Sequence, residues 1–187
     1  TGGSVHIAGD QAASSGLVIN ANNDITVTDG GLATSGAMSL ASYGDIVLTG
    51  ANRGTIVKSG GVMNITAANL RAYGGNAINP GGFATGTTQA FLGSTGVEDL
   101  SGQGAGVAIK SAMAQNIDIA SGEILLQAGS ANNGGGYGGF MYGGTVGIWS
   151  TGTQNIQAAN IKLFGGAGGH DNNAEIQSFG DQAITLY

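Results

Sequence analysis

Two carboxylates hold the same place before two apolar segments of this sequence. Asp24 precedes Ile25 and Asp45 precedes Ile46, in segments whose patterns match. A pair of carboxylates can act as general acid and base, which is the chemistry that cleaves polysaccharides. Most acidic residues of the chain, however, stand beside Gly or Asn, where an Asp side chain caps backbone groups in turns. The pattern therefore favours a structural turn role for Asp24 and Asp45 over catalysis.

A second group of ligand-type side chains lies late in the sequence. His170, Asp171 and Glu175 offer one imidazole and two carboxylates, which could hold a cation. The Gly-Gly-x-Gly-x-Asp repeat of calcium-binding solenoids is approached once, in residues 165–171, and does not recur. The absence of Cys excludes thiolate metal sites and a disulfide scaffold. We therefore expect no metal site and no cofactor.

Aromatic side chains form a third candidate site. Tyr137 and Tyr142 lie in a Gly-rich stretch, and Trp149 follows at a strand position expected to point outward. Exposed rings suit stacking on sugars or contact with a protein. The alternative is that these rings pack down onto the molecule, and the sequence leaves both readings open. Tyr137, Tyr142 and Trp149 are thus the candidates for contact with a glycan or a partner.

A repeated sequence motif, called the phrase below, must position these side chains. An apolar residue, a variable residue and a serine are followed by an isoleucine six residues after the serine. The full copies are Val57-Lys58-Ser59 with Ile65, Ile109-Lys110-Ser111 with Ile117, Ile148-Trp149-Ser150 with Ile156, and Ile176-Gln177-Ser178 with Ile184. A fainter copy starts at Ala33-Thr34-Ser35. A unit that recurs in this way indicates a repeat architecture.

The phrase predicts a solenoid of short strands. Its units of about 24 to 28 residues contain segments such as Ile46-x-Leu48, which are too short to form a stable hairpin sheet alone. When such segments stack about 4.8 Å apart, equal positions form rows. We expect an all-β fold, a right-handed single-stranded parallel β-helix of about seven or eight coils, as one domain over residues 1–187. A β-sandwich is the alternative, but it does not explain why the apolar and serine positions keep the same spacing in each copy of the phrase.

The alternation within a unit predicts where each side chain points. The apolar positions line the core, and the serine shares their side, inside or at a corner, where its hydroxyl can bond a neighbouring hydroxyl or a turn carbonyl. The residues between them are expected to point outward: Lys58, Lys110, Trp149 and Gln177. Three glutamines share one phase and are expected to form an amide ladder: Gln115, Gln154 and Gln182.

Two Gly-rich stretches lengthen individual units. They cover residues 75–106 and 129–144, each after the last strand of its unit. Insertions at one corner of a coil, with the strands unchanged, are expected of a solenoid. The first insertion carries an apolar set that could cover a flank of the coils or form a subunit contact: Phe83, Phe91, Leu92, Val97 and Leu100.

Composition narrows the classes of function. Gly makes up 38 of the 187 residues, without the Gly-X-Y period of collagen. The net charge is −6, and the five Lys and Arg residues are scattered, which argues against nucleic-acid binding. No apolar run reaches the length of about 18 residues that a membrane-spanning helix needs.

Two segments carry a family resemblance. Residues 61–75 and 151–166 combine the patterns Gly-x-hydrophobic-x-hydrophobic-x-Ala and Asn/Asp-Ile-x-Leu-x-Gly. The sequence resembles the haemagglutinin-type repeats of filamentous haemagglutinin and related two-partner-secreted bacterial adhesins, over most of residues 17–74 and 107–187. The resemblance implies an extended, extracellular β-helix at the bacterial cell surface, used for attachment and aggregation. The chain is shorter than such adhesins and lacks a recognisable secretion domain.

The repeat also runs to both ends of the sequence. Val5 and Ile7 begin it, and Ile184, Leu186 and Tyr187 close it in mid-unit, so we expect exposed strand edges and an open apolar core at both ends. Either these coils stack on neighbouring repeats of a longer chain, or the last coil stacks on the first coil of another copy and builds an open filament.

The leading hypothesis is therefore a non-enzymatic, extracellular subunit of a bacterial surface fibre, with itself as partner. A glycan-binding segment of a large secreted adhesin is the first alternative. A polysaccharide lyase or hydrolase is the second, and the lack of a tight acid–base cluster disfavours it.

Overall fold

A computed structural model describes residues 3–51, 54–75, 106–130, 144–167 and 172–187 of the chain. Every regular element in these ranges is a β-strand, and every strand pair is parallel. The strands form one sheet of ten and one of six. The expected all-β class with parallel stacked strands is thus confirmed, as a parallel β-solenoid.

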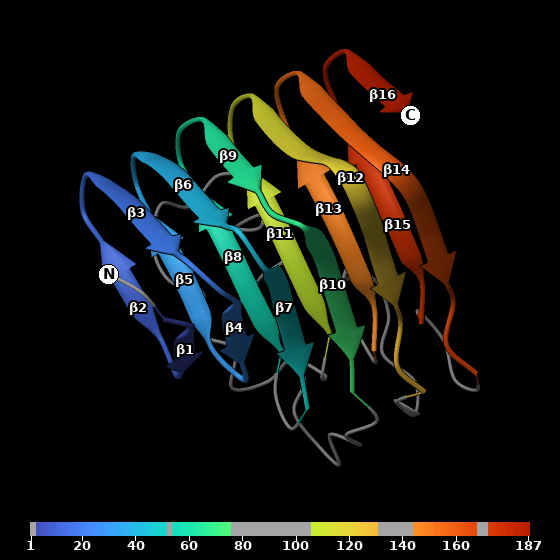
Figure 1. Cartoon of the computed structure of the whole chain (residues 1–187), viewed down its shortest axis with the longest axis horizontal. Coiled ribbons are helices and arrows are strands. Elements are labelled where there is room, and N and C mark those ends of the chain that lie inside the picture. The colour runs from blue at the N-terminus through green and yellow to red at the C-terminus, as the bar shows by residue number, and fades with distance from the viewer. Residues whose placement is uncertain (1–2, 52–53, 76–105, 131–143, 168–171) are drawn as a thin grey trace, which may run out of the picture.

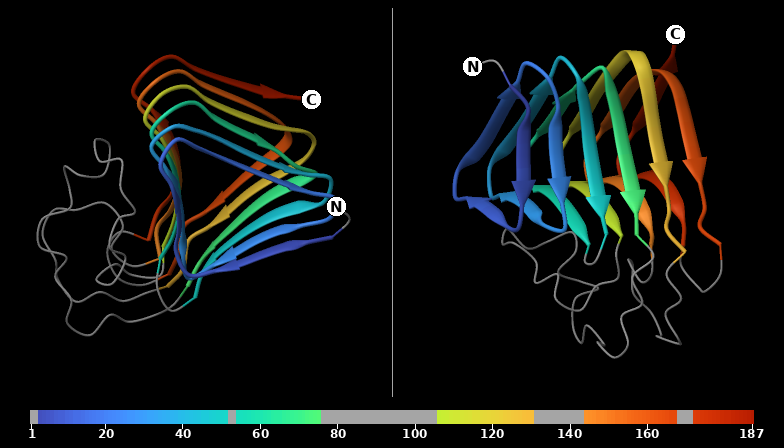
Figure 2. Two further views of the ribbon diagram at one scale, coloured as in Figure 1. Left: turned by 90° about the vertical axis from the view of Figure 1, so that its left-hand side faces the viewer. Right: turned by 60° about the horizontal axis from the view of Figure 1, so that its bottom comes forward.

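Successive strands take turns on three walls around a common core (Figures 1 and 2). Wall 1 consists of β1 (Val5–Ala8), β4 (Ile25–Thr28), β7 (Asp45–Gly50), β10 (Asn69–Gly74) and the second halves of β12 (Gln115–Gln127) and β14 (Gln154–Phe164). Wall 2 consists of β2 (Gln11–Ala13), β5 (Gly31–Thr34), β8 (Thr55–Ser59), β11 (Val107–Ser111), β13 (Val146–Ser150) and β15 (Ala174–Ser178). Wall 3 consists of β3 (Gly16–Ala21), β6 (Ala37–Ser42), β9 (Met63–Thr66), the first halves of β12 and β14, and β16 (Gln182–Leu186).

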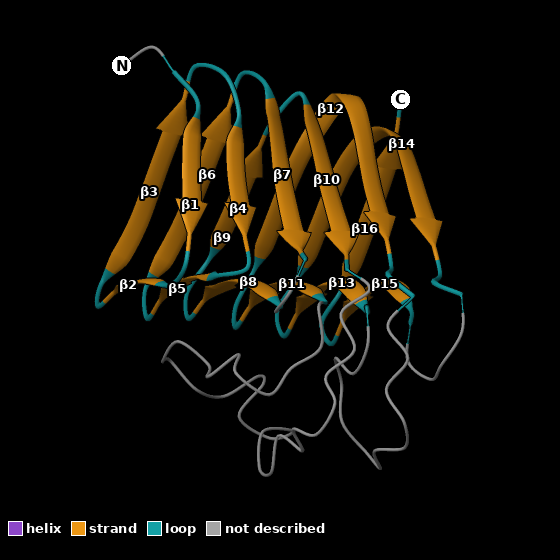
Figure 3. Cartoon of the chain, turned by 90° about the horizontal axis from the view of Figure 1, so that it is seen from below, coloured by secondary structure: helices purple, strands orange, loops and turns teal. Residues whose placement is uncertain are grey.

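Figure 3 shows β1, β4, β7 and β10 side by side along wall 1. The strands β12 and β14 are long because each continues from wall 3 around a corner into wall 1. Their mutual register shifts at that corner, between Ile119 and Glu123. The same corner joins walls 3 and 1 in the earlier turns through short connections, so the two long strands unite both walls into the ten-stranded sheet.

The recurring phrase forms two core rows, as predicted. On wall 2 the row is Leu32, Val57, Ile109, Ile148 and Ile176. On wall 3 it is Leu40, Ile65, Ile117, Ile156 and Ile184. Most members of both rows are buried in one continuous cluster, so the apolar side chains of successive turns pack directly on one another.

The fainter first copy of the phrase was misplaced by one residue. Thr34, and not Ser35, pairs with Ser59. The spacing explains the error, because Leu40 lies six residues after Thr34 and five after Ser35. Thr34 also makes the same local contact as Ser59, because the Oγ1 atom of Thr34 accepts a hydrogen bond from the amide two residues on, that of Gly36, at 3.2 Å.

The serines of the phrase bond carbonyls between turns at a corner, which is one of the two arrangements expected. Each hydroxyl donates to a carbonyl of the preceding turn, at 2.7 to 2.9 Å. The pairs are Ser59 with Gly36, Ser111 with Gly61, Ser150 with Met113 and Ser178 with Gly152. Ser59, Ser111 and Ser150 are buried, so these bonds satisfy corner carbonyls that lie away from water.

Close approach of the turns also explains two corner glycines. A Cβ on Gly36 would lie 1.6 Å from the carbonyl oxygen of Ser15, and a Cβ on Gly122 would lie 1.7 Å from that of Ala68. No side chain fits at such distances, so at these positions only glycine permits the spacing of the turns.

The glutamine ladder is confirmed as well. The Gln154 Nε2 atom donates to Gln115 Oε1 at 2.8 Å, and Gln182 Nε2 donates to Gln154 Oε1 at 2.5 Å. Gln115 and Gln154 are fully buried on the core side. The preceding turns carry Met38 and Met63 in the same row, so the row passes from apolar to amide side chains along the stack.

This ladder predicts a coupled stability effect. Gln154→Met should lower the free energy of unfolding by about 1–3 kcal/mol, because it leaves the buried Gln115 oxygen without its donor. Adding Gln115→Met should restore part of that loss, since a methionine pair already fits this row. Urea unfolding of the two single variants and the double variant measures the coupling. A double variant as unstable as the sum of the two singles would contradict the ladder's contribution.

Gln177 of the outward row of wall 2 is exposed as expected, but the other three members of the row differ. Lys58, Lys110 and Trp149 alternate with the core residues as predicted, yet they are only 5%, 2% and 2% exposed. Every residue of β8, β11 and β13 is buried, which is typical of parallel strands covered on both faces. The alternation correctly gave the direction of these side chains but carried no information on whether that face is covered.

Candidate functional site at the two ends of the stack

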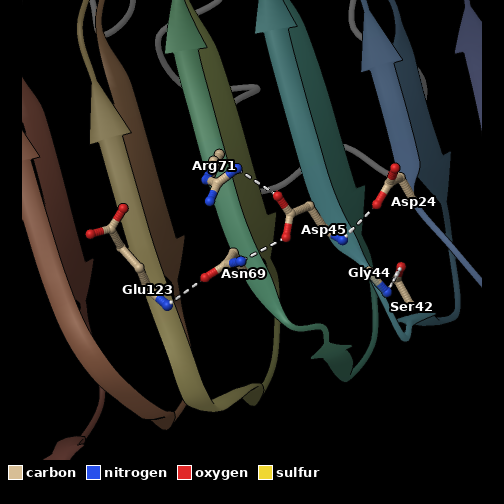
Figure 4. A network of polar contacts seen from close by, with 7 residues as sticks. All are labelled: Asp24, Ser42, Gly44, Asp45, Asn69, Arg71 and Glu123. Atoms are coloured by element: carbon tan, nitrogen blue, oxygen red, sulfur yellow. Dashed lines mark hydrogen bonds and ion pairs between the residues drawn. The ribbon is translucent and has the colours of Figure 1, made fainter.

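The acidic residues singled out in the sequence belong to a polar row at the corner before wall 1 (Figure 4). Asp45 pairs with Asn69, and Glu123 pairs with Asn160, in successive turns. Asp24 takes the equivalent place in the turn before Asp45, since Ile25 pairs with Ile46. The two carboxylates therefore occupy neighbouring turns.

Their contacts are structural. Asp24 Oδ1 accepts a hydrogen bond from the Asp45 amide at 2.9 Å. The two oxygens of Asp45 accept from Asn69 Nδ2 at 2.7 Å and from Arg71 Nη1 at 2.6 Å. Each carboxylate thus binds the backbone or side chains of the next turn, and these bonds hold the turns together.

The row continues in the same way beyond Asp45. Asn69 Oδ1 accepts from the Glu123 amide at 2.9 Å, and Glu123 forms an ion pair with Lys162 at 2.5 Å. Side chains at this corner therefore hold successive turns together, through backbone amides at some positions and through side-chain amides or ion pairs at others.

A structural role for this row predicts a specific stability loss. Asp45→Ala should lower the free energy of unfolding by about 1–2 kcal/mol, a modest value because the ion pair is part-exposed. Asp45→Asn should cost less, since an amide oxygen still accepts from Asn69. Asp181→Ala, at an exposed turn residue, serves as the matched control in thermal or urea unfolding. Equal stability of Asp45→Ala and the control would contradict this assignment.

The remaining side-chain candidates do not assemble into a site in the described part of the chain. Tyr137, Tyr142, His170 and Asp171 lie outside the described residues. Trp149 is buried instead of exposed: its ring lies over Gly147, and its Nε1 atom donates to Glu175 Oε1 at 3.0 Å. Among the described residues, no three His, Cys, Asp or Glu side chains gather as a metal site would require.

The first end face of the stack is formed by β1, β2 and β3, and it is hollow. A cavity of about 320 Å³ opens there, lined mainly by Ile7, Gln11, Leu17, Ile19 and Leu32. These side chains belong to the core rows of the first two turns. The hollow is therefore the open end of the apolar core, where one further layer of side chains would fit.

The second end face carries exposed apolar side chains. It is formed by β15, β16 and the second half of β14. Leu163, Ile184 and Leu186 are 45%, 46% and 59% exposed, although their positions are buried in the inner turns. Tyr187 is also exposed, with its amide bonded to the Ala158 carbonyl at 3.2 Å. Large exposed apolar side chains that gather on one face are typical of an interaction surface.

Both end faces also present strand edges. Within the described residues, no strand pairs with the outer edges of β1, β2 and β3, or with those of β15, β16 and the second half of β14. Such edges offer rows of backbone N–H and C=O groups to an added strand. The two ends thus combine main-chain hydrogen-bonding capacity with unfilled apolar rows.

Five residues that the sequence analysis assigned to the ends of the stack do lie on these two faces. Val5 and Ile7 lie half-buried on the first face, and Ile184, Leu186 and Tyr187 lie exposed on the second. Sequence reasoning missed Leu17 and Ile19, and also Ile161 and Leu163. Aligning each apolar position with its row would have found them, because Leu163 continues the row of Ile7 and Ile161 that of Val5.

Comparisons with protein-family models, with curated proteins and with solved structures found no match for this chain. In the part of the chain that the structure describes, no helix is long and apolar enough to span a membrane.

Proposed function

We propose that this chain is a non-enzymatic structural protein that assembles end to end into a fibre by adding coils to its two end faces. The observation that carries this proposal is the complementarity of those faces. One is a hollow lined by apolar side chains, and the other presents apolar side chains in the same rows. Filling the hollow would remove both apolar surfaces from water, and strand addition would satisfy both edges.

The occupant of each face is a second copy of the same chain. A copy offers both the required strand lengths and the matching row positions. A contact between two different faces of identical chains builds an open filament when the rotation between copies does not close a ring, and stacking along the axis of the coil does not close one. The buried lysines and the inter-turn use of Asp24 and Asp45 support a structural role over catalysis.

The location and the finer fold belong to the same proposal. The resemblance to haemagglutinin-type repeats supports an extracellular fibre on a bacterial surface, with adhesion as its use. We also propose a right-handed coil, because parallel strand crossovers are right-handed in nearly all known cases. The count of about seven or eight coils stays a prediction, since the described residues supply six strands to wall 2.

The proposal predicts concentration-dependent assembly that depends on the second face. The purified chain should form fibres visible by electron microscopy, and Leu186→Asp should raise the critical concentration by about tenfold or more, because it places a charge in the buried interface. Sedimentation and negative-stain microscopy measure this.

Tyr43→Asp is the matched control. Tyr43 is 85% exposed at a corner of an inner turn, away from both end faces, so this variant should assemble like the parent chain. Circular dichroism checks that both variants keep their β-structure. A parent chain that stays monomeric at high concentration would refute the proposal.

A further inference from the structure

The bonds between turns at the corner after wall 2 point one way along the stack. At the corner after wall 2, the amide of one turn donates to the carbonyl of the preceding turn. Gly60 donates to Thr34 at 2.8 Å, Ala112 to Ser59 at 2.9 Å, and Phe179 to Ser150 at 3.0 Å. The first turn therefore presents the equivalent amide, that of Ser14, and the last turn presents the equivalent carbonyl, that of Ser178.

The polar row before wall 1 has the same direction. The Asp45 amide donates to Asp24 Oδ1, and the Glu123 amide donates to Asn69 Oδ1, each at 2.9 Å. In the last turn this place is held by Asn160, which is exposed. In the first turn it is held by Ser4, whose Oγ accepts from the Asp24 amide at 3.4 Å. The Ser4 amide and Asn160 Oδ1 are thus the donor and acceptor that continue the row.

The shapes of the end faces exclude the other pairings. Two first faces placed together would enclose two hollows and leave their apolar linings without packing partners. Two second faces would bring the exposed Leu163, Ile184 and Leu186 of both copies together with no hollow to receive them. Only a first face against a second face joins a hollow to the side chains that fill it.

Resting on the proposed function, we infer that copies join head to tail in one register, which continues every row of the stack. In this register β16 of one copy lies beside β3 of the next, β15 beside β2, and the second half of β14 beside β1. Ile184 then meets Ile19, Leu163 meets Ile7, and Ile176 lies over Gln11 at the hollow. The Ser14 and Ser4 amides of the next copy donate to the Ser178 carbonyl and to Asn160 Oδ1.

Engineered cysteines test the register directly, because the natural chain has no Cys. On the outer face of wall 3, one row runs through Val18, Ser39, Asn64, Asn116, Asn155 and Ala183. Stacking in register places Val18 of one copy next to Ala183 of another, about 4.8 Å apart between Cα atoms, within the range of a disulfide. Both residues are exposed and point away from the core.

The chain carrying Val18→Cys and Ala183→Cys should give a ladder of covalent oligomers on mild oxidation, seen by non-reducing electrophoresis. The matched control carries Val18→Cys and Thr185→Cys. Thr185 belongs to the neighbouring row with Asn20, so its Cα would lie about 8 Å from that of residue 18, too far for a disulfide. This control should give no ladder.

The single variants report on polarity. Covalent dimers from Val18→Cys alone would indicate paired first faces, and dimers from Ala183→Cys alone would indicate paired second faces. Sedimentation of the same samples under reducing conditions measures assembly independently of the disulfides. Samples that assemble but link only through the control pair or the single variants would overturn the register while end-to-end assembly stands. Samples that do not assemble at all would overturn both proposals.

Discussion

Parallel hydrogen bonding between successive turns holds this molecule together, and it requires each position to stack on its own equivalent. A parallel ladder leaves little freedom of register, because a shift of one residue would move every core side chain to the outer face. Each row must therefore be filled by side chains that tolerate close stacking at about 4.8 Å. Apolar residues meet this condition by packing, and polar residues meet it only when each one bonds the next.

The polar rows show how that condition is met. The buried Gln115 and Gln154 share amide hydrogen bonds, and the serine hydroxyls bond corner carbonyls of the preceding turn. Asp45 stacks on Asn69 and is neutralised by Arg71. Buried polar groups are costly without partners, and here the partner is supplied by the equivalent position one turn away. The same geometry leaves the last member of each row with capacity to bond a further turn.

Much of this arrangement could be read from the sequence, because a repeat fixes which residues are equivalent. The rows of Val57 and Ile65, the serine corner and the glutamine ladder all followed from spacing alone. The Ser35 error arose where the phrase is faint and a threonine replaces the serine. The burial of Lys58, Lys110 and Trp149 could not be predicted, since alternation reports the direction of a side chain and not its exposure. Ile161 and Leu163 were not assigned to the end face because only the last residues of the chain were considered, whereas the last turn of the stack also includes the second half of β14.

The placement of the basic residues has a consequence for the durability of the protein. In the described part of the chain, all four stand inside paired strands: Lys58 in β8, Arg71 in β10, Lys110 in β11 and Lys162 in β14. Lys58 and Lys110 are also buried. A trypsin-like protease cuts after Lys or Arg and needs a stretch of backbone that can leave its hydrogen bonds, which loops offer and central strands do not. Lys58, Arg71 and Lys110 lie in strands paired on both sides, so at these three positions the coil keeps the peptide bonds that such an enzyme recognises inside the hydrogen-bonded sheet.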